Sequence, residues 1–141
     1  MKNVQAQFQM LDNYVKEYNL KTNCKLLESM DINMNGEVEF RIVNITEKDN
    51  ELIGEIELTN NIELIVEEET KAQIKITMGG LFKYSNKDEK EKFENMLKIN
   101  GATTLSHFIR TYIHTNSAIS GMPNIITPMI NFVEFFKEET E

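Results

Sequence analysis

The chain is poor in the residues from which disulfide frameworks, metal clusters and nucleic-acid-binding surfaces are built. Cys24 is its single cysteine, so neither an intrachain disulfide nor a thiolate metal cluster can form, which suits a reducing compartment. Positive charge is scarce as well, because 15 Lys and Arg face 23 Asp and Glu and leave a formal charge of −8. Such a chain repels phosphate backbones and anionic lipid headgroups. Nucleic acid is therefore not an expected partner.

Long apolar runs are missing too. No stretch reaches the roughly eighteen apolar residues of a membrane-spanning helix, and the first residues lack the uninterrupted apolar segment of a secretory signal. We therefore expect a cytoplasmic chain without membrane insertion. Its 141 residues suffice for one hydrophobic core, so residues 1–141 are expected to form a single domain.

No catalytic or metal-binding constellation is visible in the sequence. DINMNGEVEFRI, residues 31–42, imitates a calcium loop, but its twelfth position is Ile42 where a bidentate Glu is required. An Asn-Gly turn leading into a strand is the better interpretation. His107 and His114 are two helical turns apart, too far for joint metal ligation without outside ligands, and no nucleophile motif accompanies them. We expect no enzyme activity, no cofactor and no metal.

Apolar and polar residues alternate from Glu37 to about Tyr84, which is the period of half-buried strands. In EVEFRIVNI, ELIGEIEL and KAQIKITM the apolar side chains share one face and most charged ones lie on the other. The intervening turns, TEKDN and EEETK, are short and polar, so consecutive strands are expected to be antiparallel neighbours. FQMLDNYVKEYNLKT, residues 8–22, fits either a strand or a helix, and we interpret it as a further strand.

The period becomes helical after this region. Ser85 or Asn86 can cap a helix over about 87–99, which Asn100-Gly101 is expected to end. Thr104 is the expected cap of a second, longer helix.

The longer helix carries an apolar stripe and ends at Gly121. Asn131 then begins a short last helix rich in Phe. Strands followed by helices predict an α+β domain. The stripe on the long helix is too apolar for one small sheet to cover, so we expect an oligomer interface formed by Phe108, Ile109, Tyr112 and Ile113.

GMPNIITPMINFVEFF, residues 121–136, is strongly apolar and contains a single charge, Glu134. A membrane span is excluded, because Pro and Asn interrupt the segment and no Lys or Arg flanks its N-terminal side. Two interpretations remain open. The segment is either core and subunit interface, or a binding groove in which Pro123 and Pro128 hold the chain extended under a Phe-rich lid.

The order and spacing of these segments resemble the SecB family of protein-export chaperones, from about Phe8 to Phe136. FQMLDNYVKEYNLK resembles the first strand of that family, EVEFRIVNIT its second, and MGGLF the Gly-Gly-Ile-Phe that ends its sheet. FIRTYIHTNSAISGMPNIITPMINF carries the family's Arg in the long helix (Arg110), its Gly-x-Pro (residues 121–123) and a variant of its Pro-Val-Asn-Phe (residues 128–132).

The resemblance implies a four-stranded antiparallel sheet with C-terminal helices packed on one face, assembled as a homotetramer, a dimer of dimers. Family members hold unfolded precursors in apolar grooves, without ATP or a cofactor, and many pass them to the motor SecA. Some SecB-like proteins instead protect an aggregation-prone antitoxin, which is the variant that we prefer here. The client-binding residues implied by the family are Leu81, Phe82, Met122, Ile125, Ile126, Met129, Phe132, Phe135 and Phe136.

One departure concerns the outer face of the sheet, which docks the zinc-bearing tail of SecA and is acidic in the docking members of the family. The matching positions here are Glu17, Lys21, Gln73 and Lys75, so only Glu17 keeps the negative charge. We therefore expect weak SecA docking. The alternative to a chaperone of either kind is a structural or adaptor protein whose apolar C-terminal segment is a self-association surface.

Overall fold

The computed structural model describes residues 7–140, with side chains for residues 7–137. Four long strands come first and helices follow. Their bounds are β1 (Phe8–Thr22), β2 (Asn33–Lys48), β3 (Glu51–Val66) and β4 (Glu69–Tyr84), then α1 (Lys90–Met96), a π-helical turn η1 (Leu97–Gly101), α2 (Ala102–Ile119) and α3 (Phe132–Thr140).

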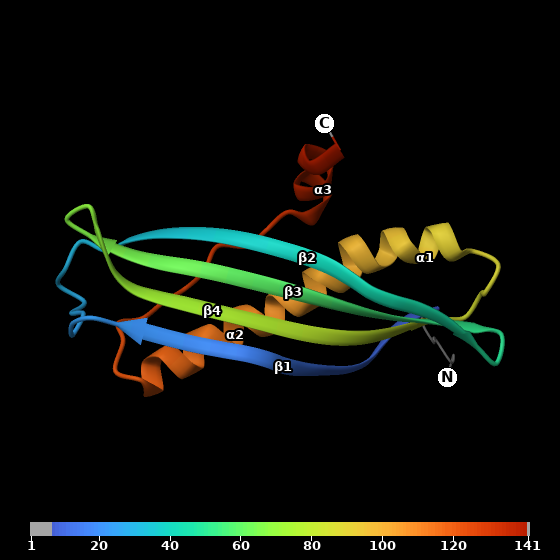
Figure 1. Ribbon diagram of the computed structural model, residues 1–141, viewed down its shortest axis with the longest axis horizontal. Helices are drawn as coiled ribbons and strands as arrows, with labels where there is room; N and C mark the ends of the chain where they lie inside the picture. Colours follow the sequence, from blue (N-terminus) through green and yellow to red (C-terminus); the bar gives the residue numbers. More distant parts are fainter. Residues whose placement is uncertain (1–6, 141) are drawn as a thin grey trace, which may run out of the picture.

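The strands form one antiparallel sheet in the order β1-β4-β3-β2. Figure 1 shows α1 and α2 crossing behind this sheet, on one face only, while α3 stands beside β2 at the sheet edge. The expected α+β fold, with a four-stranded antiparallel sheet and C-terminal helices on one face, is confirmed. The segment of residues 8–22, interpreted as a further strand, is the edge strand β1, so this interpretation is confirmed.

The sheet buries one face because its apolar residues keep a strict period of two. Along β3 and β4 the inner residues are buried and the outer ones are mostly partly or fully exposed. Ile109 and Ile113 of α2 complete this core from the helical side and are fully buried. The two hairpins turn through residue pairs with positive φ, at 49–50 and 67–68, as expected for tight turns whose twist matches that of the strands.

Three sequence predictions about the helix boundaries are wrong. The first helix begins at Lys90 rather than near residue 87, and Asn86 caps only the preceding turn, accepting a hydrogen bond from the Asp88 amide (3.0 Å). The chain also stays helical through Gly101 (φ −63°, ψ −51°). A β-carbon on Gly101 would lie 2.9 Å from Cδ1 of Ile56, so this glycine allows a close approach to β3 and does not end a helix.

Thr104 does not cap the long helix, because α2 is already under way at that position. Its hydroxyl donates to the carbonyl of Asn100 (2.8 Å), one turn back. The other two expected boundaries are confirmed. Gly121 follows the end of α2 with a φ of 79°, and the side chain of Asn131 accepts hydrogen bonds from the amides of Val133 (3.1 Å) and Glu134 (3.3 Å) at the start of α3.

Candidate functional site

Residues 120–131 connect α2 to α3, and we call this segment the crossover. Figure 1 shows it passing behind the sheet from the end of α2 toward the β2 edge. Its side chains alternate. Pro123, Ile125 and Thr127 are buried, whereas Ile126 and Pro128, on either side of Thr127, are exposed. The crossover is therefore extended, as the two prolines predict, with one row of side chains against the sheet and one row in solvent.

Polar side chains from outside the crossover, rather than a neighbouring strand, bind the carbonyl groups of the crossover. Nε of Arg110 in α2 donates to the carbonyl of Thr127 at 2.9 Å. Nζ of Lys25 donates to the carbonyl of Gly121, and Nδ1 of His114 lies 3.4 Å from the carbonyl of Ile125. Carbonyl groups of an extended segment need such partners where water is excluded. Arg110, which the resemblance singled out, thus positions the crossover.

The last helix, α3, docks through its aromatic residues. Phe132 is buried, and its ring centroid lies 5.7 Å from that of Phe135 and 6.2 Å from that of Phe136. Phe136 also meets Phe40 of β2 edge to face, with 5.1 Å between centroids. Such pairs add to the free energy of burial. They fix α3 against the edge strand, next to the end of the crossover.

Large apolar side chains remain exposed along this edge. Ile126 and Met129 in the crossover are 62% and 69% exposed. Val133 on α3 and Met34 on β2 are exposed as well, at 44% and 38%. We call these four residues the crossover surface. Soluble chains rarely expose apolar groups in such a cluster unless another molecule covers them.

The structure brings together only part of the client-binding set implied by the resemblance. Ile126 and Met129 lie on the crossover surface, and Met122, Phe135 and Phe136 are half-buried beside it. Phe82, Ile125 and Phe132 are buried in the core, so they offer no surface in this conformation. Leu81 projects from the outer face of the sheet, away from the crossover, because neighbouring strand residues point to opposite faces.

Four residues of this region were not predicted from the sequence. Met34 and Val133 belong to the crossover surface, and Asn60 and Thr127 are buried polar residues beside it. A signal existed for Asn60, which interrupts the apolar inner row of β3 between Leu58 and Ile62. A polar residue in such a row needs a reason.

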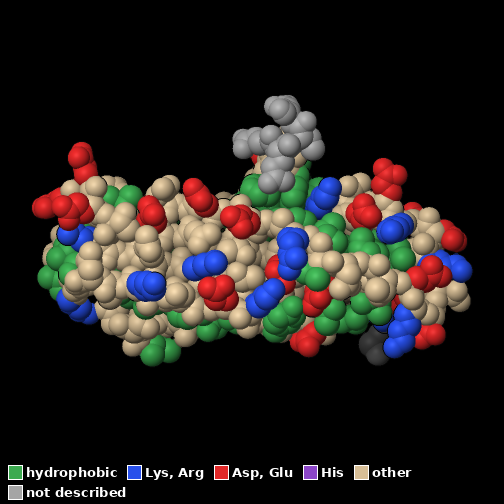
Figure 2. All heavy atoms as spheres, in the orientation of Figure 1, with side chains coloured by type: hydrophobic (Ala, Val, Ile, Leu, Met, Phe, Trp, Pro, Cys, Tyr) green, Lys and Arg blue, Asp and Glu red, His purple; other side chains and the backbone are tan. Residues whose placement is uncertain are grey.

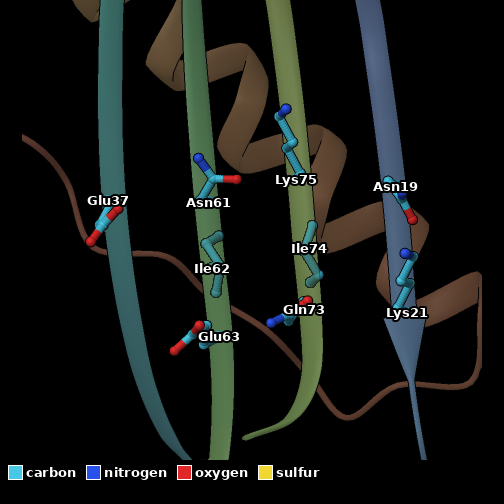
Figure 3. A pocket seen from close by; sticks show the side chains of 9 residues that line it. All are labelled: Asn19, Lys21, Glu37, Asn61, Ile62, Glu63, Gln73, Ile74 and Lys75. Atoms are coloured by element: carbon cyan, nitrogen blue, oxygen red, sulfur yellow. The ribbon is translucent and has the colours of Figure 1, made fainter.

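The outer face of the sheet carries the four positions matched to the SecA-docking surface. Lys21 pairs with Gln73 in the register of β1 and β4, and Lys75 Nζ lies 3.6 Å from a carboxylate oxygen of Glu17. Figure 3 shows Lys21, Gln73 and Lys75 around a shallow cavity of about 350 Å³. The same view places Glu37 and Glu63 on the β2 and β3 side. Even the charge of Glu17 is therefore partly offset by a lysine.

Charge of both signs continues along this face, and Figure 2 shows Lys, Arg, Asp and Glu interspersed over it. Glu57 of β3 is the centre of a triad, with Nζ of Lys16 at 2.7 Å and a guanidinium nitrogen of Arg41 at 3.0 Å. The hydrogen bond from Lys16, helped by that from Arg41, lowers the pKa of Glu57 although burial opposes the shift. The triad links three strands across the outer face.

Replacing Glu57 with Gln should lower the free energy of unfolding by about 1 kcal/mol at neutral pH. A carboxyl whose pKa is lowered by folding stabilises the fold above its ordinary value of 4.5, and this stabilisation is lost as the pH falls through the lowered value. Urea unfolding at fixed protein concentration should therefore separate the two proteins at pH 7, and the difference should disappear as the pH falls through the lowered pKa of Glu57.

Glu63→Gln serves as the matched control, because Glu63 lies on the same face of β3 and has no ion pair among the described residues. Its unfolding should match that of the unmodified protein over the same pH range. A Glu57→Gln difference that does not depend on pH would contradict the role of the charge.

The four residues expected to form the oligomer interface do not all lie on the same face of α2. Ile109 and Ile113 face the sheet and are fully buried, whereas Phe108 is 42% exposed and Tyr112 half-buried. Phe108 and Tyr112 line a cavity of about 420 Å³ together with Tyr14 and Val15 of the edge strand β1. The hydroxyl of Tyr14 donates to Glu55 (2.9 Å), and this hydrogen bond raises the pKa of Tyr14.

Among residues 7–137, no group of three or more His, Cys, Asp or Glu side chains is arranged to hold a metal ion. The calcium-like stretch begins in a loop and continues as strand β2, as the mismatch at Ile42 indicates. None of the helices in the described part is long and apolar enough to cross a membrane.

The antiparallel sheet carries helices on one face, and apolar side chains are exposed along the crossover. This arrangement defines the class of proteins that bind other polypeptides. The chain belongs to the SecB family, since residues 1–141 match the family described as preprotein translocase subunit SecB. The resemblance drawn from the sequence is thereby confirmed, and with it the holding of client polypeptides as the function of this family. Comparison with curated protein sequences gives no match.

A solved structure has the same fold. It is the Mycobacterium tuberculosis Rv1957 SecB-like chaperone in complex with a ChAD peptide from the Rv1956 HigA1 antitoxin. The TM-score is 0.70 at 13% sequence identity, and the alignment covers 89% of this chain and 91% of that one. At this identity the likeness establishes the fold.

Proposed function

We propose that this protein is an ATP-independent holding chaperone that binds unfolded polypeptides on the crossover surface, without enzymatic activity. The observation that carries the proposal is the exposure of Ile126 and Met129 on a segment whose backbone Arg110 binds. A surface that is already ordered loses little entropy when a client binds. We infer a cytoplasmic location from the single cysteine and from the family.

The affinity of one such surface is modest. Burying about 400 Å² of apolar client surface contributes on the order of 10 kcal/mol, and ordering the client and losing its free motion offset most of this. Several copies acting on one client chain would gain affinity through effective concentration. Oligomerisation is thus part of the proposed function.

The test is suppression of aggregation of a slowly refolding client protein, followed by light scattering without ATP. We expect aggregation to fall as the molar ratio of chaperone oligomer to client approaches about one. A protein that leaves aggregation unchanged at a large molar excess would favour the alternative, a structural or adaptor protein that only associates with itself.

We prefer a dedicated client such as an antitoxin to the general pool of exported precursors. The structural neighbour was solved with an antitoxin peptide, and the outer face here lacks the uniformly acidic surface that SecA docking uses in the family. We further propose that the whole 141-residue chain acts as one domain.

We expect the protein to be a homotetramer, a dimer of dimers. Phe108 and Tyr112 on α2, with Tyr14 and Val15 on β1, form an apolar face that a second copy can cover. Light scattering at micromolar concentration should give four times the mass of the 16.4 kDa chain, and Phe108→Asp should lower the mass. A monomer in the unmodified protein would remove the assembly from the proposal.

SecA should bind weakly to the outer face. Lys21 and Lys75 repel the basic residues around the zinc of the SecA tail, and like charges across an interface reduce affinity. Calorimetric titration with a zinc-loaded tail peptide at low salt should give little heat, and Lys21→Glu with Lys75→Glu should strengthen binding. Tight binding by the unmodified protein would instead restore general export as the function.

A further inference from the structure

The exposed methionines of the chain lie together on the crossover surface. Met34 and Met129 are exposed, and they are the only exposed methionines among residues 7–137. Met78 is buried in the core at 4% exposure. The other methionines of this range are half-buried and pack against the core, namely Met10, Met30, Met96 and Met122. Solvent therefore reaches two thioether side chains freely, and both belong to the surface that is proposed to bind clients.

Met34 and Met129 come from different segments but are neighbours at the edge of the sheet. Met34 lies near the start of β2, where it pairs with Leu64 of β3. It lines a cavity of about 160 Å³ together with Pro128 and Ile130, the residues on either side of Met129. A small oxidant that reaches one of these methionines therefore meets the other on the same part of the surface.

A thioether is an apolar group that hydrogen peroxide oxidises to a sulfoxide. The sulfur lone pair attacks one peroxide oxygen, so that a sulfur–oxygen bond forms while the oxygen–oxygen bond breaks. The proton of the transferred hydroxyl passes to the departing hydroxide, which leaves as water. Sulfur loses two electrons and the peroxide gains them. Ile126 and Val133, which complete the crossover surface, contain no sulfur and stay unchanged.

Oxidation changes what the crossover surface offers to a client. A sulfoxide is polar, and covering it with an apolar chain removes its hydration without supplying a hydrogen-bond donor. The fold does not depend on either methionine, because both are exposed and Arg110 binds the crossover through the carbonyl of Thr127. Oxidation of Met34 and Met129 should therefore lower the affinity for clients and leave the fold intact.

We propose that Met34 and Met129 form a reversible oxidation site that regulates client binding, in which peroxide converts both side chains to sulfoxides and the client is released. A methionine sulfoxide reductase restores the thioethers. Two thiols reduce each sulfoxide, and a disulfide and one water molecule are formed. The inference rests on the proposed function and adds regulation to it.

The first measurement locates the oxidation. Full-length protein carrying Cys24→Ser, which removes the exposed thiol, is treated with dilute hydrogen peroxide, and catalase then removes the peroxide. Mass spectrometry of its peptides should show one added oxygen atom at Met34 and at Met129, each formed at least about tenfold faster than at Met78. Equal rates at the three residues overturn the site.

The second measurement follows binding of labelled, reduced and carboxymethylated lactalbumin, which stays unfolded, by fluorescence anisotropy. Peroxide treatment should weaken binding about fivefold, and methionine sulfoxide reductase with dithiothreitol should restore it. Circular dichroism of the treated protein should match that of the untreated protein, because Met78 stays reduced. Unfolding of the treated protein, or unchanged binding once both sulfoxides have formed, overturns the inference.

Met34→Leu combined with Met129→Leu tests the assignment. Each variant is compared with its own untreated sample, so a change in starting affinity does not enter. After peroxide this double variant should keep its affinity within about twofold, because leucine has a similar volume and no sulfur. Met10→Leu combined with Met96→Leu is the matched control, and it should lose as much affinity as the parent protein. Equal losses in the two double variants overturn the site.

Two outcomes separate this inference from the function on which it rests. If the untreated and the oxidised protein bind lactalbumin equally well, the oxidation site fails and the holding function stands. If the untreated protein neither binds lactalbumin nor suppresses the aggregation of an unfolded client, both fail together.

Discussion

Replacing Ile126 and Met129 together with Asp should reduce the holding of an unfolded client at least about tenfold. Both side chains are largely exposed on the crossover surface, so the fold does not depend on them, but a client that covers them would have to bury two unpaired carboxylates. The measurements are aggregation suppression with a slowly refolding client and circular dichroism to follow the fold.

The chain offers a matched control for this experiment. Ile119, at the end of α2, is 79% exposed and lies outside the crossover surface. Ile119→Asp adds a carboxylate of the same kind and should leave holding within about twofold of the unmodified protein. Equal loss in both variants would mean that net charge, rather than the crossover surface, controls the assay. Unfolding of the double variant would assign Ile126 and Met129 to structure.

Phe132→Ala should release α3 from the edge of the sheet. Deleting a buried Phe side chain costs about 3 kcal/mol or more, and Phe132 is the residue of α3 that lies in the buried core, at 2% exposure. Because α3 meets the edge strand through the contact of Phe136 with Phe40, the loss should be local. Amide hydrogen exchange of α3 should accelerate on the order of 100-fold while the strands stay protected.

Val133→Ala is the control on the same helix, since Val133 is exposed where Phe132 is buried. It should change exchange of α3 only slightly. A large fall in the unfolding temperature of the Phe132 variant, with all elements exchanging together, would show that α3 is part of the main cooperative unit. The helix could not then act as a lid that opens separately.

The strands were predictable because the polarity of each strand residue indicates which face of the sheet it lies on. Ile74 and Lys75 alternate in sequence and point to opposite faces in the structure, since the strand period is fixed by backbone geometry. The same rule explains an error in the candidate site. Leu81 and Phe82 were taken together by resemblance, although they point to opposite faces of the sheet, and only Phe82 faces the helices.

Other features depend on contacts that no local pattern encodes. Gly101 looks like a helix stop, and only the closeness of Ile56 explains its presence inside a helical run. Ile109 and Phe108 are equally apolar in sequence, yet α2 turns one toward the sheet and the other toward solvent. The crossover was correctly predicted to be extended, but the role of Arg110 in binding its backbone depends on a distance between segments far apart in the chain.

The crossover and the outer face of the sheet should respond differently to salt, because the crossover is held by the hydrogen bond from Arg110 to the carbonyl of Thr127. A hydrogen bond to a neutral carbonyl is far less sensitive to ionic strength than an exposed ion pair. The outer face is held by carboxylates such as Glu57, whose attraction to Lys16 weakens as salt rises. Rising salt therefore weakens the ion pairs of the outer face but leaves the position of the crossover unchanged.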